Sequence, residues 1–328
     1  MNAPRTGTGR QQRGVALLIA IVVVAIAAML STGMIWNREL DIRRTANITQ
    51  GDQAMEYALG AEAWAEQILR RDYQTDPGST NLTQDWAMQL PPLPVQGGTV
   101  TGHLEDLQGL FNINNLASSN AVQATAALAQ FQRLLVALNL DPEIADAAAD
   151  WVNPGTQPRF PGGAKDGYYS PLDPPYVTAE QPMASVSELL LVKGVTPQVY
   201  ATLLPYVCAL PVQPPGSAPG TPRSATAINV NTAPPPVLMS ITTGISADMA
   251  AGAIETRAQQ PFQNTTQLTQ LLGNIAVPAG IPALQTTSNY FRLTATVKIG
   301  SAQLSLYSLL YRMPSGATVA IRRTFGSL

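Results

Sequence analysis

The pattern of hydrophobic and polar positions predicts one very long helix at the start of the chain. Residues 15–36 form a run of 22 residues without a charge, and a helix needs about 20 apolar residues to cross a bilayer. Hydrophobic residues then recur at helical spacing over 38–71, and no proline interrupts 15–76. Such a helix is several times longer than the usual ~11–12 residues, so we expect it to pack against a sheet or neighbouring helices.

Alternating hydrophobic and polar residues predict strands on both sides of a long middle stretch. The predicted strands cover 98–106, 290–298, 303–312 and 318–325, and Gly/Ser and Pro/Ser/Gly turns separate the last three. Because strands lie both before and after it, the middle stretch 116–287 is predicted to be an insertion. We therefore expect an α+β fold, with the long helix packed on an antiparallel sheet and a large all-α insertion.

The insertion has a helical pattern that proline-rich joints interrupt, notably over 211–222. Proline lacks the backbone N–H that a helix interior needs, so each joint is expected to end a helix. The predicted helices cover 121–138, 142–152, 186–193, 197–204, 235–241, 247–259 and 266–272.

Composition and charge exclude several classes of protein. With 45% hydrophobic and 12% charged residues the chain is too apolar to be disordered, and a net charge of −2 gives no general attraction to nucleic acid. Its one cysteine, Cys208, cannot form an intramolecular disulfide and is expected in the core. The only histidine, His103, lies in an alternating strand and is expected to be exposed. No zinc-protease helix or phosphate-binding loop is present, so we expect no enzymatic activity.

The residues before the hydrophobic run predict its orientation and its processing. Three arginines and no acidic residue lie within 1–13, which places the N-terminus in the cytoplasm and the bulk of the chain on the far side, the periplasm in a bacterium. A secretory signal cut near 25–27 and an uncut signal anchor are two alternatives. At 12–18, however, Gly14 ends the basic stretch and the apolar run begins abruptly. This junction resembles a type IV prepilin leader.

The resemblance implies that a prepilin peptidase cuts after Gly14 on the cytoplasmic face. Val15 would then be the new N-terminus and would be methylated. Residues 1–14 would be a cytoplasmic leader that is removed, and 15–36 would remain as the transmembrane half of the long helix.

Five stretches of the chain resemble, in the same order, the K-type minor pseudopilin of the type II secretion system. They lie at 53–66, 106–114, 149–151, 185–189 and 229–233. The resemblance covers most of the chain. It implies a pilin-like body, formed by 37–115 and 288–328, into which the helical domain 116–287 is inserted.

The fifth residue after the expected cut bears on the place of the subunit in a filament. Most pilins carry Glu there, and its carboxylate is thought to neutralise the N-terminus of a neighbour, since an unpaired charge in a low dielectric is costly. This chain has Ile19, a departure that the K type shares, and the resemblance implies a position at the filament tip. The alternative is that Ile19 only suits a bilayer helix. A bulky insertion also fits the end of a filament better than its wall.

The second half of the insertion, 228–273, resembles the helix-hairpin-helix unit of DNA-uptake receptors. Those units bind phosphate through amides at a helix N-terminus, normally with two glycines and nearby basic residues. Here Ser246 replaces the second glycine, and Arg257 is the only basic residue from 228 to 272. We therefore expect no nucleic acid partner and interpret the unit as a packing element.

A loop that follows residue 150 is a candidate metal site. It contains turn residues and oxygen donors, and in K-type relatives it looks like a calcium loop. The resemblance implies Asp150, Asn153 and Asp166 as ligands, but Asn153 and Lys165 replace acids, which leaves two carboxylates. The alternatives are a weakened calcium site or an ordinary structured loop. No other cofactor is expected.

Together these features predict a non-enzymatic minor pseudopilin in the bacterial inner membrane, with a single span and a periplasmic C-terminal body. The resemblance implies that it caps the tip of the pseudopilus with I-type and J-type minor pseudopilins, helps to initiate that filament, and supports export of folded exoproteins across the outer membrane. Its other partners would be the inner-membrane secretion platform, the prepilin peptidase and the secreted exoproteins. The alternative is a minor pilin of a type IV DNA-uptake or adhesion pilus.

Overall fold

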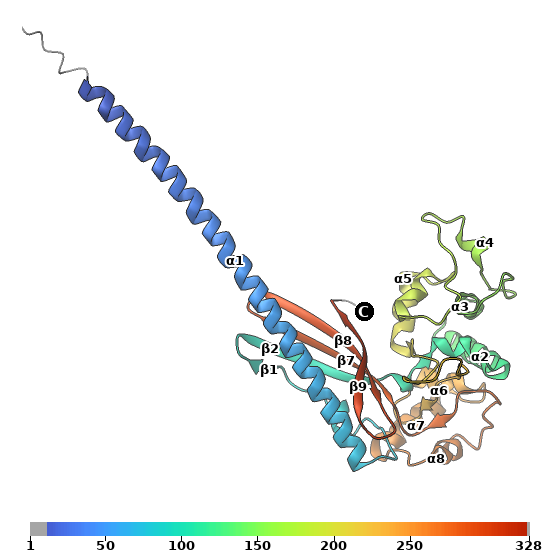
Figure 1. Cartoon of the computed structure of the whole chain (residues 1–328). Helices are drawn as coiled ribbons and strands as arrows, with labels where there is room; N and C mark the ends of the chain where they lie inside the picture. Colours follow the sequence, from blue (N-terminus) through green and yellow to red (C-terminus); the bar gives the residue numbers. More distant parts are fainter. Residues whose placement is uncertain (1–11, 327–328) are drawn as a thin grey trace, which may run out of the picture.

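The computed structural model describes residues 12–326 and shows a long rod attached to a wider part of the protein (Figure 1). The rod is α1 (Gln12–Thr75), one unbroken helix of 64 residues, which confirms the long helix that the sequence predicts. Its first part extends away from the rest of the protein, and its second part lies along a sheet (Figure 1).

The sheet has five antiparallel strands in the order β1-β2-β7-β8-β9. The strands are β1 (Leu93–Val95), β2 (Gly98–Asp106), β7 (Tyr290–Ile299), β8 (Ala302–Arg312) and β9 (Thr318–Phe325). The four longer strands confirm the predicted ones. The sequence did not predict β1, because it has three residues and one of them is Pro94, which is tolerated only at a sheet edge.

The helix packs on the sheet through small residues. Ala54, Ala58 and Ala65 on α1 are buried, and their small side chains let the helix lie close to the strands. Alternate residues of β7 point at this face, and Trp86 packs edge-on against Phe291 at 5.4 Å between ring centres. The buried faces of α1 and of the sheet together form one hydrophobic core. We call the second part of α1 and the five-stranded sheet the body.

The insertion leaves the sheet at the end of β2 and returns to it at the start of β7. Its helices are α2 (Ala121–Ala137), α3 (Ile144–Val152), α4 (Asp166–Tyr169), α5 (Pro197–Leu203), α6 (Pro235–Ile241), α7 (Ala247–Gln259) and α8 (Thr265–Leu271), with a 3-10 helix at Val186–Leu191. These helices agree closely with the predicted ones, except that 186–193 is 3-10 rather than α-helical and that α4 was not predicted.

Two short parallel strand pairs join distant parts of the chain. They are β3 (Phe111–Asn112) with β4 (Val207–Cys208), and β5 (Ile228–Asn229) with β6 (Leu284–Gln285). The regular structure of the insertion is therefore helical apart from these pairs. Each strand has only two residues, too few for an alternating pattern to reveal.

The hydrophobic core of the insertion begins before residue 116. Phe111 and Ile113 are fully buried in it, and the ring of Phe111 stacks on that of Phe131 at 5.1 Å. The packing boundary between body and insertion thus lies at about Phe111, five residues earlier than the sequence pattern placed it. Cys208 is buried at the junction of the two parts, as expected, and its thiol donates to the Leu107 carbonyl at 3.2 Å.

The insertion lies at the C-terminal end of α1. At the end of the sheet nearer the apolar segment of α1, Gln50 accepts a hydrogen bond from the Ser301 backbone. At the far end of the sheet, Arg312 lies over the Tyr73 ring at 4.9 Å. Asp106 and Phe291, where the chain leaves and rejoins the sheet, are register partners at that far end.

Candidate functional site

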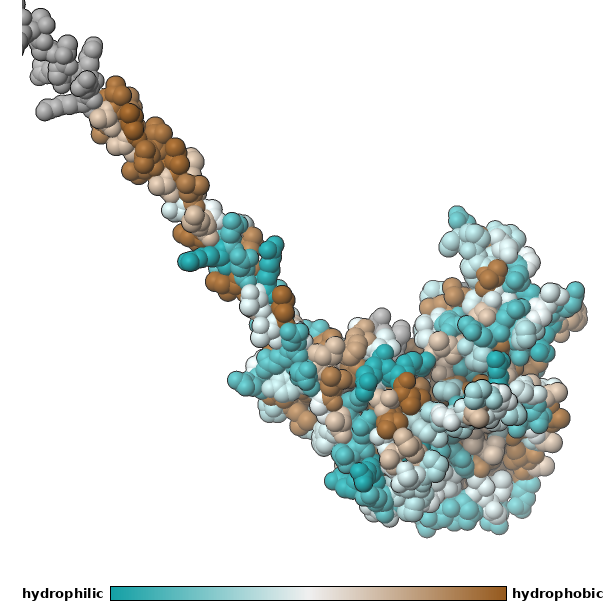
Figure 2. All heavy atoms as spheres, viewed as in Figure 1, coloured by the Kyte–Doolittle hydropathy of each residue, from teal (hydrophilic) through white to brown (hydrophobic). Residues whose placement is uncertain are grey.

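The first part of α1 has the properties of a membrane anchor. Within the described residues, one helix is long and apolar enough to cross a membrane. Its most apolar stretch of 18 residues has a mean hydropathy of 2.9, and none of that stretch is buried in the protein. Figure 2 shows this segment as a continuous hydrophobic surface. Ser31 and Thr32, two of its few polar residues, donate to the carbonyls of Ala27 and Ala28, which satisfies them inside the helix.

Gly14, Val15 and Ile19 all lie in this exposed segment. Ile19 is 59% exposed and Val15 is 57% exposed, and a Cβ added at Gly14 would meet no heavy atom within 4 Å. Most of the expected leader, 1–11, lies outside the described residues. The fold therefore places no packing constraint on these three positions.

Glu62 fixes α1 to the last two strands of the sheet. It is 4% exposed, and it accepts two-pronged hydrogen bonds from the guanidinium of Arg323 on β9 at 2.7–3.0 Å and one from the Ser308 hydroxyl on β8. One turn along, Glu66 accepts from the Ala320 backbone at 3.1 Å, and burial together with nearby Glu62 raises the pKa of Glu66. Sequence analysis missed this clamp.

Asp106 is the centre of a buried hydrogen-bond network where body and insertion meet. It accepts from the Gln108 backbone at 2.8 Å and from the side chains of Asn229, Thr232 and Ser288 at 2.5–2.9 Å. Burial is the main influence on this carboxyl and raises its pKa. The motif at 229–233 thus has a structural role, since it ties the insertion to the end of β2.

Arg312 closes the same junction from the side of β8. The residue is 2% exposed and donates to the Thr80 hydroxyl at 2.7 Å and to the Ser288 carbonyl, while its guanidinium lies over the rings of Tyr73 and Phe291. Burial lowers the pKa of Arg312. An arginine at the end of a strand with no other charged residue was the available signal, but its partners could not be identified from the sequence.

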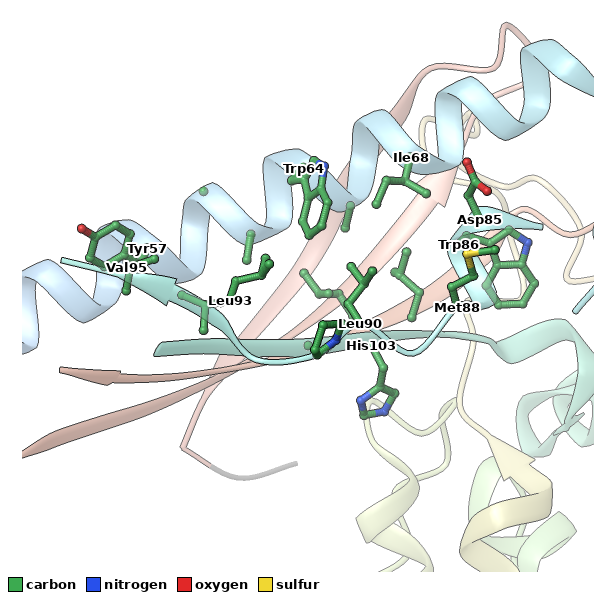
Figure 3. A pocket seen from close by; sticks show the side chains of 18 residues that line it. Tyr57, Trp64, Ile68, Asp85, Trp86, Met88, Leu90, Leu93, Val95 and His103 are labelled. Carbon is green, nitrogen blue, oxygen red and sulfur yellow. The ribbon is translucent and has the colours of Figure 1, made fainter. Parts of the chain in front are cut away.

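An apolar groove of about 250 Å³ lies between α1 and the β1 side of the sheet. Figure 3 shows Trp64 and Ile68 reaching from α1 towards Leu90 and Leu93, whereas the His103 ring points away from the helix. Trp64 is 45% exposed, so an aromatic surface is open to solvent here. His103 is exposed, as the sequence predicts.

The helix-hairpin-helix-like unit uses its one basic residue internally. Arg257 is 7% exposed and donates to the carbonyls of Val230 and Ala233, both at 2.7 Å. Ser246 caps α7 by accepting from the Met249 backbone at 3.2 Å. The guanidinium is therefore committed to holding α7 on the 229–233 motif, which agrees with a packing role.

The loop after α3 contains the candidate metal ligands but gives each a different partner. Asp150 is buried, and its carboxylate accepts from the Arg159 backbone at 2.9 Å and pairs with the Arg159 guanidinium at 3.3 Å. Asp166 is exposed and accepts twice from Thr178, at 2.7 and 2.9 Å. Burial raises the pKa of Asp150, whereas the hydrogen bonds from Thr178 lower the pKa of Asp166.

Lys165 lies inside this loop and is 5% exposed. Its ammonium donates to the backbone carbonyl of Asp150 at 2.6 Å and to that of Asn153. The side-chain amide nitrogen of Asn153 donates to the carbonyls of Leu116 and Ala149. Among the described residues no three His, Cys, Asp or Glu side chains gather in a metal-binding arrangement. The residues present therefore do not fit a calcium ion.

Comparisons with known proteins agree along almost the whole chain. Family models described as "Type II secretion system (T2SS), protein K" match residues 109–212 and 228–287. The chain is 32% identical to type II secretion system protein K of Aeromonas hydrophila, over 97% of this chain and 98% of that one. It is also 32% identical to protein K of Pseudomonas aeruginosa, over 97% and 94%.

A solved structure has the same fold. The matching chain comes from the crystal structure of the GspK-GspI-GspJ complex of the enterotoxigenic Escherichia coli type 2 secretion system. The TM-score is 0.74 at 24% identity, and the match covers 87% of this chain and 100% of that one.

Proposed function

The chain belongs to the type II secretion system protein K family, and from this membership we propose that it caps the tip of the periplasmic pseudopilus. In this role it helps to start the filament and to move folded exoproteins across the outer membrane. The role is mechanical and associative, and we assign no catalytic step to any residue.

The position of the insertion carries this proposal. The insertion joins the body beside Tyr73, at the end of α1 farthest from the apolar segment, and it spreads sideways from the rod (Figure 1). A domain that spreads sideways would collide with neighbouring subunits in the wall of a filament, whereas it has room at the tip. Ile19 supports the same position, because a subunit with nothing stacked above it has no neighbouring N-terminus to neutralise.

The proposed partners are the I-type and J-type minor pseudopilins. In the matching solved structure, GspK is in complex with GspI and GspJ. The exposed apolar groove under Trp64 gives such partners a surface on the body. Contacts with the inner-membrane platform, the prepilin peptidase and exoproteins belong to the same proposal.

The proposed location is the inner membrane, crossed once, with the body in the periplasm. The apolar segment ends at Trp36, and charged residues follow it directly, among them Glu39 and Arg43, which form an exposed ion pair at 3.0 Å. Three arginines precede the segment and favour a cytoplasmic N-terminus. Membership of the secretion family, together with the internal role of Arg257, gives the DNA-uptake alternative no support.

Electron microscopy of overexpressed pseudopili tests the tip position. We expect an epitope inserted after Gly216 to leave the fold intact, because this exposed loop of the insertion has no heavy atom within 4 Å of an added Cβ. Gold-labelled antibody is expected at one end of each filament. The same epitope on the major subunit serves as the control and should label the shaft throughout. Labelling of this chain all along the shaft would refute the tip position.

A further inference from the structure

We propose that the ammonium group of Lys165 is a built-in cation that closes the loop after α3, so that this loop is stable without bound calcium. The proposal concerns the insertion alone and does not depend on the position of the subunit in the filament.

The ammonium lies at the C-terminus of α3. The carbonyls that it binds belong to Asp150, in the last turn of the helix, and to Asn153, the residue that ends it. The last carbonyls of a helix have no partners within it and carry the negative end of its dipole, so a cation is favoured there. An ammonium has three donors, and two of them are used on these carbonyls.

A cation bound at the end of α3 would compete for the same carbonyls. Calcium takes ~6–8 oxygen ligands at about 2.3–2.6 Å, and a calcium ion bound to the two carbonyls would lie within a few ångström of the Lys165 ammonium. Two like charges at that distance in a buried site repel strongly. Calcium could therefore bind only if Lys165 left its buried position.

The neighbouring carboxylates already have hydrogen-bond or ion-pair partners within the insertion. Asp150 is held by Arg159, and Asp166 is held by Thr178. The backbone at Gly163 passes so close to Asp150 that an added Cβ would lie 2.3 Å from its carboxylate oxygen. The loop is thus folded tightly around Asp150, with its charges matched by its own basic residues.

Closing the loop places Tyr169 of α4 in the core of the insertion. Lys165 directly precedes α4, whose Tyr169 is fully buried, packs edge-on against Trp151 at 5.5 Å and accepts from the Lys193 backbone at 3.1 Å. Loss of the ammonium would leave two buried carbonyls without partners and would loosen this contact. In a background with Trp36, Trp64 and Trp86 replaced by phenylalanine, Trp151 fluorescence is a local reporter of the loop.

The test is thermal unfolding of the full-length protein in detergent, in 5 mM calcium chloride and in 5 mM EGTA. We expect the wild type to melt at the same temperature in both and to give no heat on titration with calcium. Lys165→Met keeps the aliphatic stem but removes the charge, and its Tm should fall by roughly 5 °C in either buffer. Lys298→Met, an exposed lysine on β7, is the matched control and should leave the Tm unchanged.

A charge reversal gives a positive result that does not depend on a loss of stability. Lys165→Asp frees the two carbonyls and adds a carboxylate, so calcium should raise its Tm and shift its Trp151 fluorescence. A calcium-dependent rise in the Tm of the wild type, or a Tm of Lys165→Met equal to that of the wild type, would overturn the proposal.

Discussion

The side-chain amide of Asn229 donates to the carboxylate of Asp106 at 2.9 Å, although the two residues lie 123 positions apart in the chain. The same amide also donates to the Thr80 carbonyl and to the Ser288 hydroxyl, both within 2.9 Å. One asparagine therefore connects the segment after α1, the end of β2 and the segment before β7. Buried polar groups from the body and the insertion thus bind one another at this junction.

Asp106→Ala is expected to lower the free energy of unfolding by about 3 kcal/mol, because it leaves several buried donors without an acceptor. Urea unfolding of the detergent-solubilised protein, followed by circular dichroism, measures the change. Asp52→Ala, at an exposed position on α1, is the control and should stay within about 0.5 kcal/mol of the wild type. An Asp106→Ala variant as stable as this control would show that the network contributes little.

The clamp between α1 and β9 should be stronger than an ordinary surface ion pair. We expect Arg323→Ala to cost about 2 kcal/mol, between the value for an exposed pair and the ~3–5 kcal/mol for a fully buried one, because Glu62 is buried while Arg323 is 46% exposed. Arg71→Ala breaks the exposed pair with Asp85 and should cost less than about 1 kcal/mol. If chemical unfolding shows that both variants lower the free energy of unfolding equally, the clamp is no stronger than a surface ion pair.

Replacing Gly14 with a bulky residue should block maturation without affecting the fold. Gly14→Leu is expected to leave an uncut precursor in the membrane, because the peptidase must accommodate a small residue before the cut, whereas the described structure has free space at that position. Mass spectrometry of the purified protein identifies its N-terminus. Gly33→Leu, at another unpacked glycine of α1, should still be cut. A wild-type N-terminus near residue 28, instead of Val15, would indicate a secretory signal.

Ile19→Glu should not improve secretion. If no subunit lies above this one, the new carboxylate meets no neighbouring N-terminus and is left unpaired in the bilayer, at a cost of at most ~2.5–3.5 kcal/mol. We expect export of an exoprotein to be unchanged or slightly reduced, as measured by its activity in the culture medium. Ile19→Leu is the control for the substitution itself. A clear gain in export by Ile19→Glu would mean that the chain stands in the filament wall.

Periodicity predicted the elements that are long and one-sided. The ends of α7 (Ala247–Gln259) and of β2 (Gly98–Asp106) agree with the sequence pattern to the residue, since a helix or strand with one buried face must repeat its hydrophobic positions. The strand pairs β3–β4 and β5–β6 could not be predicted, because a two-residue strand has no period and its partner is chosen by the tertiary fold.

The candidate sites were harder to predict because they depend on contacts between distant segments. The resemblance to K-type relatives implied that a lysine replaces an acid at Lys165, but not that its ammonium folds back onto the end of α3. In the same way, the alternation of β8 marked Ser308 as one polar position among others, and only the sheet topology brings it to Glu62. Charge and spacing in the sequence identify polar residues that could form contacts, whereas the fold decides which of these residues pair with one another.

The adjacent attachment points of the insertion have a mechanical consequence. Asp106 and Phe291 face each other across neighbouring strands, so both ends of the insertion are fixed to the same spot. Tension applied along α1 passes into the sheet through the packing of the helix on β7 and β8, and because both ends of the insertion join the sheet at one place, the backbone of the insertion does not lie on that path. A pull on α1 would therefore move the insertion together with the sheet without stretching the insertion between its two ends.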